Sequence, residues 1–83
     1  MNSRLHCVYV LQSKPSPERH YVGLTTDLAE RMARHNAGQV PHTSKHLPWL
    51  IETAVAFGSR VKALAFEKHL KTHSGRAFAS KHF

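Results

Sequence analysis

A chain of 83 residues is long enough for one compact domain and too short for two, so we expect a single domain over residues 1–83. Twelve Lys and Arg residues against five Asp and Glu give a net charge of +7, which indicates a polyanionic partner, with nucleic acid as the first candidate. The single cysteine, Cys7, excludes an intramolecular disulfide, and the lack of a long apolar run predicts a cytoplasmic protein that does not bind membranes.

The order of hydrophobic, polar and turn-forming residues predicts three strands and two helices. The strands are predicted at residues 5–12, 19–24 and 49–57, and the helices at residues 27–37 and 60–72. Asp27 and Glu30 have the spacing of a capping box at the start of the first helix, and Gly38 is placed to end it. Residues 39–48 predict a loop, and the basic tail at residues 76–83 predicts a further helical turn or two.

The short connection between the first two strands determines how they pair. Six residues that include two prolines separate them, whereas a parallel crossover needs a dozen or more, so we expect an antiparallel hairpin. Helices packed on a small sheet complete this arrangement, which makes the fold class α+β.

Glu67 is the most informative single residue of the second predicted helix. The apolar positions of that helix are Ala63, Leu64, Phe66 and Leu70. At 3.6 residues per turn Glu67 falls inside their arc, where a carboxylate is costly unless a divalent cation or an Arg pairs with it. The structural alternative places Glu67 at the edge of the sheet, in water or paired with Lys71 four residues on.

Arg31 and His35 form a second candidate pair, on the first predicted helix. Their four-residue spacing places both side chains on one face, beside the apolar residues Leu28 and Met32. Arg can hold a phosphate through two parallel hydrogen bonds, and His can donate to the phosphate or transfer a proton. The same spacing also fits a solvated helix flank, and alone it does not separate the two interpretations.

Tyr9 and Tyr21 lie at odd positions on the first two predicted strands. If odd residues pair with odd residues in the hairpin, both rings project from one face, either as core or as site residues. Gly23, in the second strand, indicates a bulge or a close approach of another group to the backbone.

The eight histidines raise the question of zinc. His42 and His46 have the four-residue spacing of a ligand pair, as do His69 and His73, but no paired cysteines and no His-Glu-x-x-His arrangement accompany them. We therefore expect no zinc site.

Two tripeptides on the predicted hairpin resemble a family signature. Val8-Tyr9-Val10 followed by Tyr21-Val22-Gly23 resembles the two tripeptides that define the GIY-YIG nuclease superfamily. The chain departs from that signature at Cys7 and Val8, where the family often has Gly, and at Leu24, where some relatives carry a lysine.

Later segments resemble the same family in the same order. The run from Leu24 to Arg31 is similar to the passage into the family's arginine helix, and the run from Phe66 to Lys71 is similar to its metal-binding glutamate segment. Residues 74–78 resemble the small single-domain bacterial members (UPF0213-like). The resemblance covers nearly the whole chain, from about Leu5 to Phe83.

The resemblance implies a three-stranded antiparallel sheet flanked by helices, and a metal-dependent endonuclease that hydrolyses phosphodiester bonds in nucleic acid. DNA is the expected substrate, and the sequence leaves the choice between DNA and RNA open. In that chemistry Glu67 holds one divalent cation, Mg²⁺ or Mn²⁺, and Arg31 neutralises charge that develops on the phosphate. Tyr9 is the expected base for the attacking water, Tyr21 positions the water or the phosphate, and His35 is the second candidate for proton transfer. Tyr9 can act as a base only if Arg31 and the cation lower its pKa from about 10.

Further basic residues are expected to form a nucleic-acid-binding surface beside the site: Arg34, Lys45, Lys71, Arg76 and Lys81. Contacts to the phosphate backbone should make binding weaker at high salt. A nucleic-acid-binding module without catalytic turnover is the alternative function. The sequence predicts neither the structure of the target nor the oligomeric state.

Overall fold

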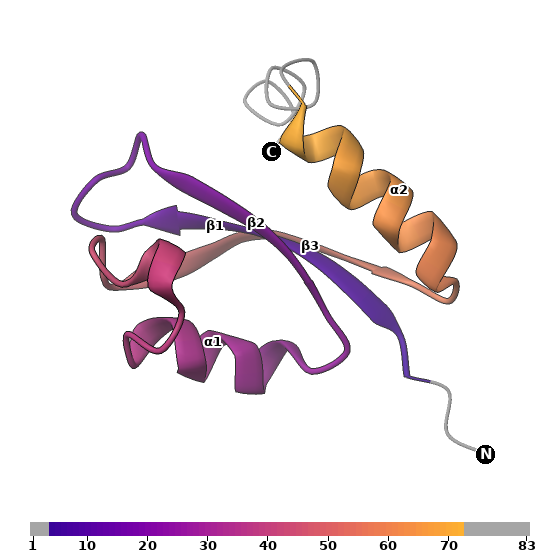
Figure 1. Ribbon diagram of the computed structural model, residues 1–83, viewed down its shortest axis with the longest axis horizontal. Coiled ribbons are helices and arrows are strands. Elements are labelled where there is room, and N and C mark those ends of the chain that lie inside the picture. The colour runs from indigo at the N-terminus through magenta and orange to yellow at the C-terminus, as the bar shows by residue number, and fades with distance from the viewer. Residues whose placement is uncertain (1–3, 73–83) are drawn as a thin grey trace.

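The computed structural model describes residues 4–72 and has the predicted elements in the predicted order (Figure 1). The strands are β1 (His6–Ser13), β2 (His20–Thr25) and β3 (Trp49–Phe57), and the helices are α1 (Leu28–Asn36) and α2 (Arg60–Lys71). Every predicted boundary is confirmed to within one residue. The predicted loop at residues 39–48 contains a short 3₁₀ helix, η1 (Pro41–Thr43), which was missed. The predicted helical tail lies outside the described residues.

The three strands form one antiparallel sheet in the order β2-β1-β3, which confirms the α+β class and the predicted hairpin. In the hairpin Tyr9 pairs with Gly23, and Leu11 pairs with Tyr21. Odd residues therefore pair with odd residues, and both tyrosines project from the same face of the sheet.

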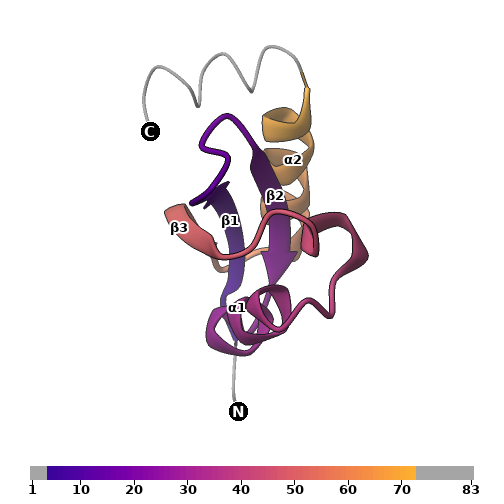
Figure 2. The ribbon, with the colours of Figure 1, turned by 90° about the vertical axis from the view of Figure 1, so that its left-hand side faces the viewer.

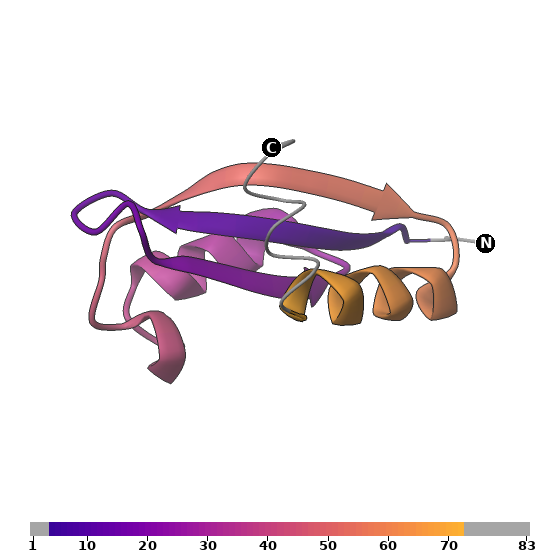
Figure 3. The ribbon, with the colours of Figure 1, turned by 90° about the horizontal axis from the view of Figure 1, so that it is seen from above.

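Each helix covers one face of the sheet, because alternate side chains of β1 point to opposite faces. The face covered by α2 has a core of Val8, Val10, Ala63 and Leu70. The face covered by α1 has a core of Tyr9, Leu11 and Trp49, with Leu28 and Met32 packed against it. Figure 2 shows the two helices on opposite sides of the strands, and Figure 3 shows α2 lying on the β2 side of the sheet. Within residues 4–72, no helix has both the length and the apolar character needed to cross a membrane.

The start of α1 is fixed by side-chain caps. A carboxylate oxygen of Asp27 accepts a hydrogen bond from the Glu30 amide at 3.1 Å, as the predicted cap requires. The Asp27 amide donates to Thr25 Oγ1 at 3.0 Å, so a threonine takes the place that the Glu30 side chain would have in a full capping box. Gly38 follows the helix with φ of 75°, a conformation that glycine adopts without strain.

The end of α1 is tied to the start of β3. The side-chain amide of Asn36 donates to the Trp49 carbonyl at 3.2 Å and accepts from the Trp49 amide at 2.7 Å. The buried Trp49 indole donates from Nε1 to the carbonyl of Thr43 at 2.7 Å. These bonds hold the loop that contains η1 against the sheet, and the same loop supplies one residue of the candidate site.

Candidate active site

Tyr9 lies at the centre of the α1-covered face, and its ring passes over Gly23 of the neighbouring strand. The Tyr9 side chain is fully buried, and a Cβ added at Gly23 would meet the Tyr9 hydroxyl and Cζ, with Cε1 at 2.9 Å. The close approach that Gly23 indicated is therefore made by Tyr9. The Tyr21 ring lies beside it, with ring centroids 6.3 Å apart.

We expect Gly23→Ala to destabilise the protein by about 1–3 kcal/mol, the usual cost of overpacking a filled site. The added methyl group would occupy space that the Tyr9 ring now fills, so the ring and the hydroxyl must move. Urea unfolding measures the loss. Gly58→Ala is the control, because nothing lies within 4 Å of a Cβ built there, and equal losses in the two variants would contradict the prediction.

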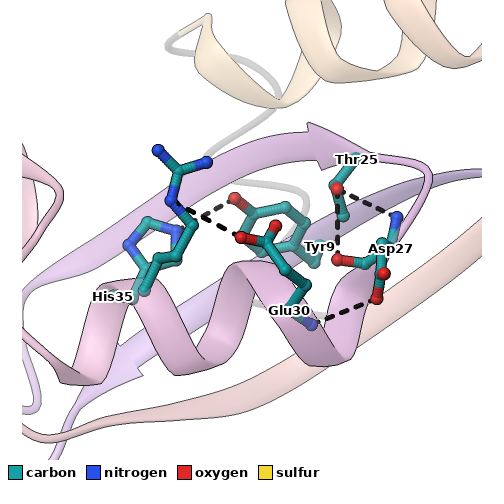
Figure 4. A network of polar contacts seen from close by, with 6 residues as sticks. Tyr9, Thr25, Asp27, Glu30 and His35 are labelled. Carbon is teal, nitrogen blue, oxygen red and sulfur yellow. Dashed lines mark hydrogen bonds and ion pairs between the residues drawn. The ribbon is translucent and has the colours of Figure 1, made fainter.

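His35 of α1 is completely buried and joins Tyr9 to Thr43. Its Nε2 lies 3.0 Å from the Tyr9 hydroxyl, a contact drawn in Figure 4, and its Nδ1 lies 2.8 Å from Thr43 Oγ1. The Thr43 hydroxyl donates its hydrogen to the carbonyl of Val40 at 3.3 Å, because a carbonyl can only accept. Thr43 Oγ1 must therefore accept from Nδ1–H, which leaves Nε2 without a hydrogen and free to accept the Tyr9 O–H.

Thr43 is thus the residue that sets the tautomer of His35, and its replacement tests this role. In Thr43→Val the buried Nδ1–H loses its acceptor, which should destabilise the fold by about 1–3 kcal/mol and reduce the population of the Nδ1–H tautomer. Nitrogen-15 chemical shifts of the His35 ring at neutral pH report the tautomer directly. Thr43→Ser keeps the hydroxyl and should restore the wild-type shifts. Unchanged shifts in the valine variant would show that Thr43 does not orient the ring.

The electrostatic environment keeps both Tyr9 and His35 uncharged at neutral pH. Burial, and to a smaller extent the positive charges of Arg31 and Arg34, lowers the pKa of His35 from its ordinary 6.5. Burial and the neighbouring Tyr21 raise the pKa of Tyr9 to about 12, although Arg31 acts to lower it. Arg31 alone therefore does not lower the pKa of Tyr9 below its ordinary value, as a base would require, because burial raises that pKa more than the charge of Arg31 lowers it.

Arg31 and Glu67, which lie on different helices, both affect the pKa of Tyr9. Arg31 lies on α1, beside Tyr9, and Glu67 lies on α2, which covers the other face. Both charges act on the pKa of Tyr9, after burial and Tyr21: Arg31 lowers it, and Glu67 raises it. β2 is an edge strand, and α2 lies on the β2 side of the sheet (Figure 3).

Glu67 sits at the border of the apolar side of α2. Ala63 and Leu70 are buried, but Leu64 is 40% exposed, so its predicted place in the apolar arc was wrong and the arc ends near Glu67. The Glu67 side chain is 18% exposed, and its Oε2 lies 3.1 Å from Lys71 Nζ. This ion pair is the one that the structural alternative predicted, and it leaves Oε1 for another partner.

The donor set fits a cation held by one protein carboxylate. Among residues 4–72, no group of three or more His, Cys, Asp or Glu side chains is placed to hold a metal ion. Mg²⁺ is commonly bound by one or two carboxylates together with waters and substrate phosphate oxygens, which Glu67 beside a bound phosphate would satisfy. His73, the last of the paired histidines, lies outside the described residues.

The structure places three of the five residues predicted for the basic surface. Arg34, Lys45 and Lys71 are exposed, and two of them are in ion pairs, with Glu30 at 3.6 Å and with Glu67 at 3.1 Å. The other two, Arg76 and Lys81, lie outside the described residues. The part of all five residues in binding nucleic acid stays a prediction, as do the catalytic roles assigned from the sequence.

The chain is similar in sequence to known nucleases. A family model described as "GIY-YIG catalytic domain" matches residues 5–81. The structure-specific endonuclease subunit SLX1 of Meyerozyma guilliermondii is 42% identical over 71 residues, which make up 77% of this chain and 24% of that protein. The SLX1 subunit of Candida dubliniensis is 37% identical over 82 residues, 90% of this chain and 27% of that protein. The chain therefore spans about a quarter of the length of these yeast relatives.

A relative of similar size also matches. A UPF0213 protein of Halobacterium salinarum is 34% identical over 68 residues, which cover 81% of this chain and 86% of that protein.

Proposed function

The chain belongs to the GIY-YIG catalytic domain family, and we propose that it is a divalent-metal-dependent endonuclease that hydrolyses phosphodiester bonds in DNA. The observation that carries the proposal is the buried Tyr9–His35 hydrogen bond, on whose hydroxyl the charges of Arg31 and Glu67 both act. A buried tyrosine hydroxyl needs one hydrogen-bond partner, but it does not need an arginine and a carboxylate whose charges act on it. Such charges are useful to a site that moves a proton beside a phosphate.

Arg31 is suited to binding and polarising the phosphate that is cut. Its guanidinium is half-buried beside Tyr9, and Nε has no hydrogen-bond partner among the described residues. A half-buried guanidinium with an unused donor can form a new charge-assisted hydrogen bond when an anion binds. It also stabilises the extra negative charge that forms on the phosphate oxygens during hydrolysis.

Tyr9 and His35 together can accept the proton of the attacking water. As the water oxygen bonds to phosphorus, its proton passes to the Tyr9 oxygen while the Tyr9 proton passes to His35 Nε2. The bond from phosphorus to the leaving oxygen breaks, with its electron pair on that oxygen. No free tyrosinate forms, which agrees with a Tyr9 pKa of about 12, and neutral His35 is ready to accept.

Glu67 would hold a divalent cation, Mg²⁺ or Mn²⁺, which when bound polarises a phosphoryl oxygen and stabilises the leaving oxygen. The charge of the carboxylate raises the pKa of Tyr9, and Oε1 is not used by Lys71. Lys71 is exposed, so its side chain can leave the ion pair at little cost.

The names of the yeast relatives support a substrate chosen by its structure rather than by its sequence. The test is a panel of linear, nicked, branched and single-stranded DNA, with matching RNA, incubated with Mg²⁺, with Mn²⁺ or with a chelator. We expect metal-dependent cutting of at least one DNA. If nothing in the panel is cut but binding weakens steeply with salt, the alternative of a non-catalytic binding module replaces this proposal.

Tyr9→Phe separates the hydroxyl from the packing of the ring. We expect the rate to fall at least about tenfold, because the water loses its proton acceptor, while the fold is kept.

The pH dependence of the wild type tests the same step. If tyrosinate were required, the rate would rise tenfold per pH unit between about pH 8 and pH 10, and we expect no such rise. Single-turnover cleavage across that range gives both answers. A variant that cuts at the wild-type rate would make Tyr9 a core residue and His35 the base.

A further inference from the structure

A hollow at one end of the sheet lies next to the candidate site and has no role in the chemistry above. It has a volume of about 260 Å³ and is lined by His6, Leu24, Thr25, Thr26, Arg31 and Arg60. These residues come from the start of β1, the end of β2 with the turn that follows, and the first residue of α2. Figure 1 shows these segments at the same end of the sheet, where both helices also begin.

The lining favours an anion. Arg31 and Arg60 are cationic, none of the six lining residues is acidic, and Asp27 is turned to the cap of α1. The hollow also borders the N-terminal ends of α1 and α2, where the helix dipoles favour negative charge. A metal ion would find no carboxylate among these residues, so a phosphate fits the hollow better than a cation does.

Two buried nitrogens of the lining lack partners. Arg31 Nε and His6 Nδ1 are the buried side-chain polar atoms that make no hydrogen bond within residues 4–72. Unpaired buried polar atoms are costly, and a pair of them in the wall of one hollow indicates a ligand that satisfies them. His6 lies on β1 three residues before Tyr9, so its side chain points to the opposite face of the sheet, and Arg31 is the lining residue that connects the hollow to the candidate site.

We propose that this hollow binds a second backbone phosphate of the nucleic-acid strand, next to the phosphate that is cut. This inference rests on the proposed function. Arg31 borders both places, because it acts on Tyr9 and also lines the hollow, so the two phosphates are neighbours on one strand. Arg60, with His6 and the Thr26 hydroxyl, holds the second phosphate and fixes the strand for cutting.

Inorganic phosphate in metal-free buffer is the first probe, titrated at constant ionic strength while the His6 ring resonances are followed by NMR. We expect saturable shifts of the His6 signals. Arg60→Gln should weaken binding about tenfold, the loss expected for one hydrogen bond to a charged group. Lys62→Gln is the matched control, because Lys62 is an exposed cation on α2 outside the hollow, and its variant should bind as the wild type does. Unmoved His6 signals, or equal losses in the two variants, would overturn the inference.

The second measurement separates this inference from the proposed function. Glu67→Gln should bind phosphate normally even though it cannot cut, so phosphate binding is judged without turnover. With a cleavable DNA, Arg60→Gln should raise KM about tenfold with little change in kcat. If the DNA is cleaved but Arg60→Gln does not change KM, the second phosphate site is contradicted and the nuclease proposal is not. Phosphate binding without any cleavage contradicts the nuclease and leaves the anion site standing.

Discussion

Replacing Glu67 by Gln is expected to abolish metal-dependent cleavage, because the amide keeps the shape of the side chain and loses the charge that holds the cation. Glu67 is the proposed carboxylate ligand, and no group of three or more ligand-type side chains among the described residues could replace it. The lost ion pair with Lys71 is largely exposed on the lysine side, so stability should change by less than about 1 kcal/mol. Thermal unfolding checks this expectation, and single-turnover cleavage with Mg²⁺ and with Mn²⁺ measures the rate.

Glu52→Gln is the matched control for that experiment. The Glu52 side chain is 22% exposed and lies 3.1 Å from His20, while that of Glu67 is 18% exposed and lies 3.1 Å from Lys71. The two substitutions remove the same charge from carboxylates with similar exposure and contact distance, but Glu52 is on β3 and is not among the charges that act on the pKa of Tyr9. Equal rates for the two variants would show that cleavage, if present, does not depend on Glu67.

The elements and their pairing could be predicted from the sequence because they depend on local patterns. The capping side chain of Asp27 and the glycine at residue 38 set the ends of α1, and both are used as expected. The short connection favoured an antiparallel hairpin, but it left the register open, and the pairing of Tyr9 with Gly23 in the structure places Tyr9 and Tyr21 on one face. The short 3₁₀ helix at Pro41–Thr43 escaped notice because three residues carry no periodicity.

The partners of the site residues could not be predicted, because they come from distant parts of the chain. His35 fitted either a solvated flank or a site, and its complete burial follows from contacts with Tyr9, 26 residues away, and with Thr43. The flank interpretation was wrong for His35. Thr43 gave no signal of its own, since a threonine in a polar loop has many ordinary roles. The partial burial of the Glu67 side chain likewise depends on how α2 packs along β2, which a helical sequence pattern does not specify.

Arg31→Ala is expected to lower the rate of cleavage about a hundredfold to a thousandfold, the usual effect of removing one preorganised charge-stabilising group. Arg31 is half-buried, lowers the pKa of Tyr9 and has an Nε without a hydrogen-bond partner among residues 4–72. Arg34→Ala is the comparison, because Arg34 is exposed on the same helix and pairs with Glu30 at 3.6 Å. Its loss should raise KM and leave kcat within about a factor of three, as expected for a cation outside the reacting centre.

The pH dependence of the same two variants distinguishes charge at the phosphate from charge at His35. Both arginines lower the pKa of His35, after the larger effect of burial, so removing either one should raise that pKa. Because His35 must be neutral to accept a proton, the acid side of the kcat profile should then move to higher pH in both variants. The plateau above it should fall only in Arg31→Ala. If the plateau falls equally in Arg34→Ala, the effect is one of overall positive charge, and Arg31 has no special position at the phosphate.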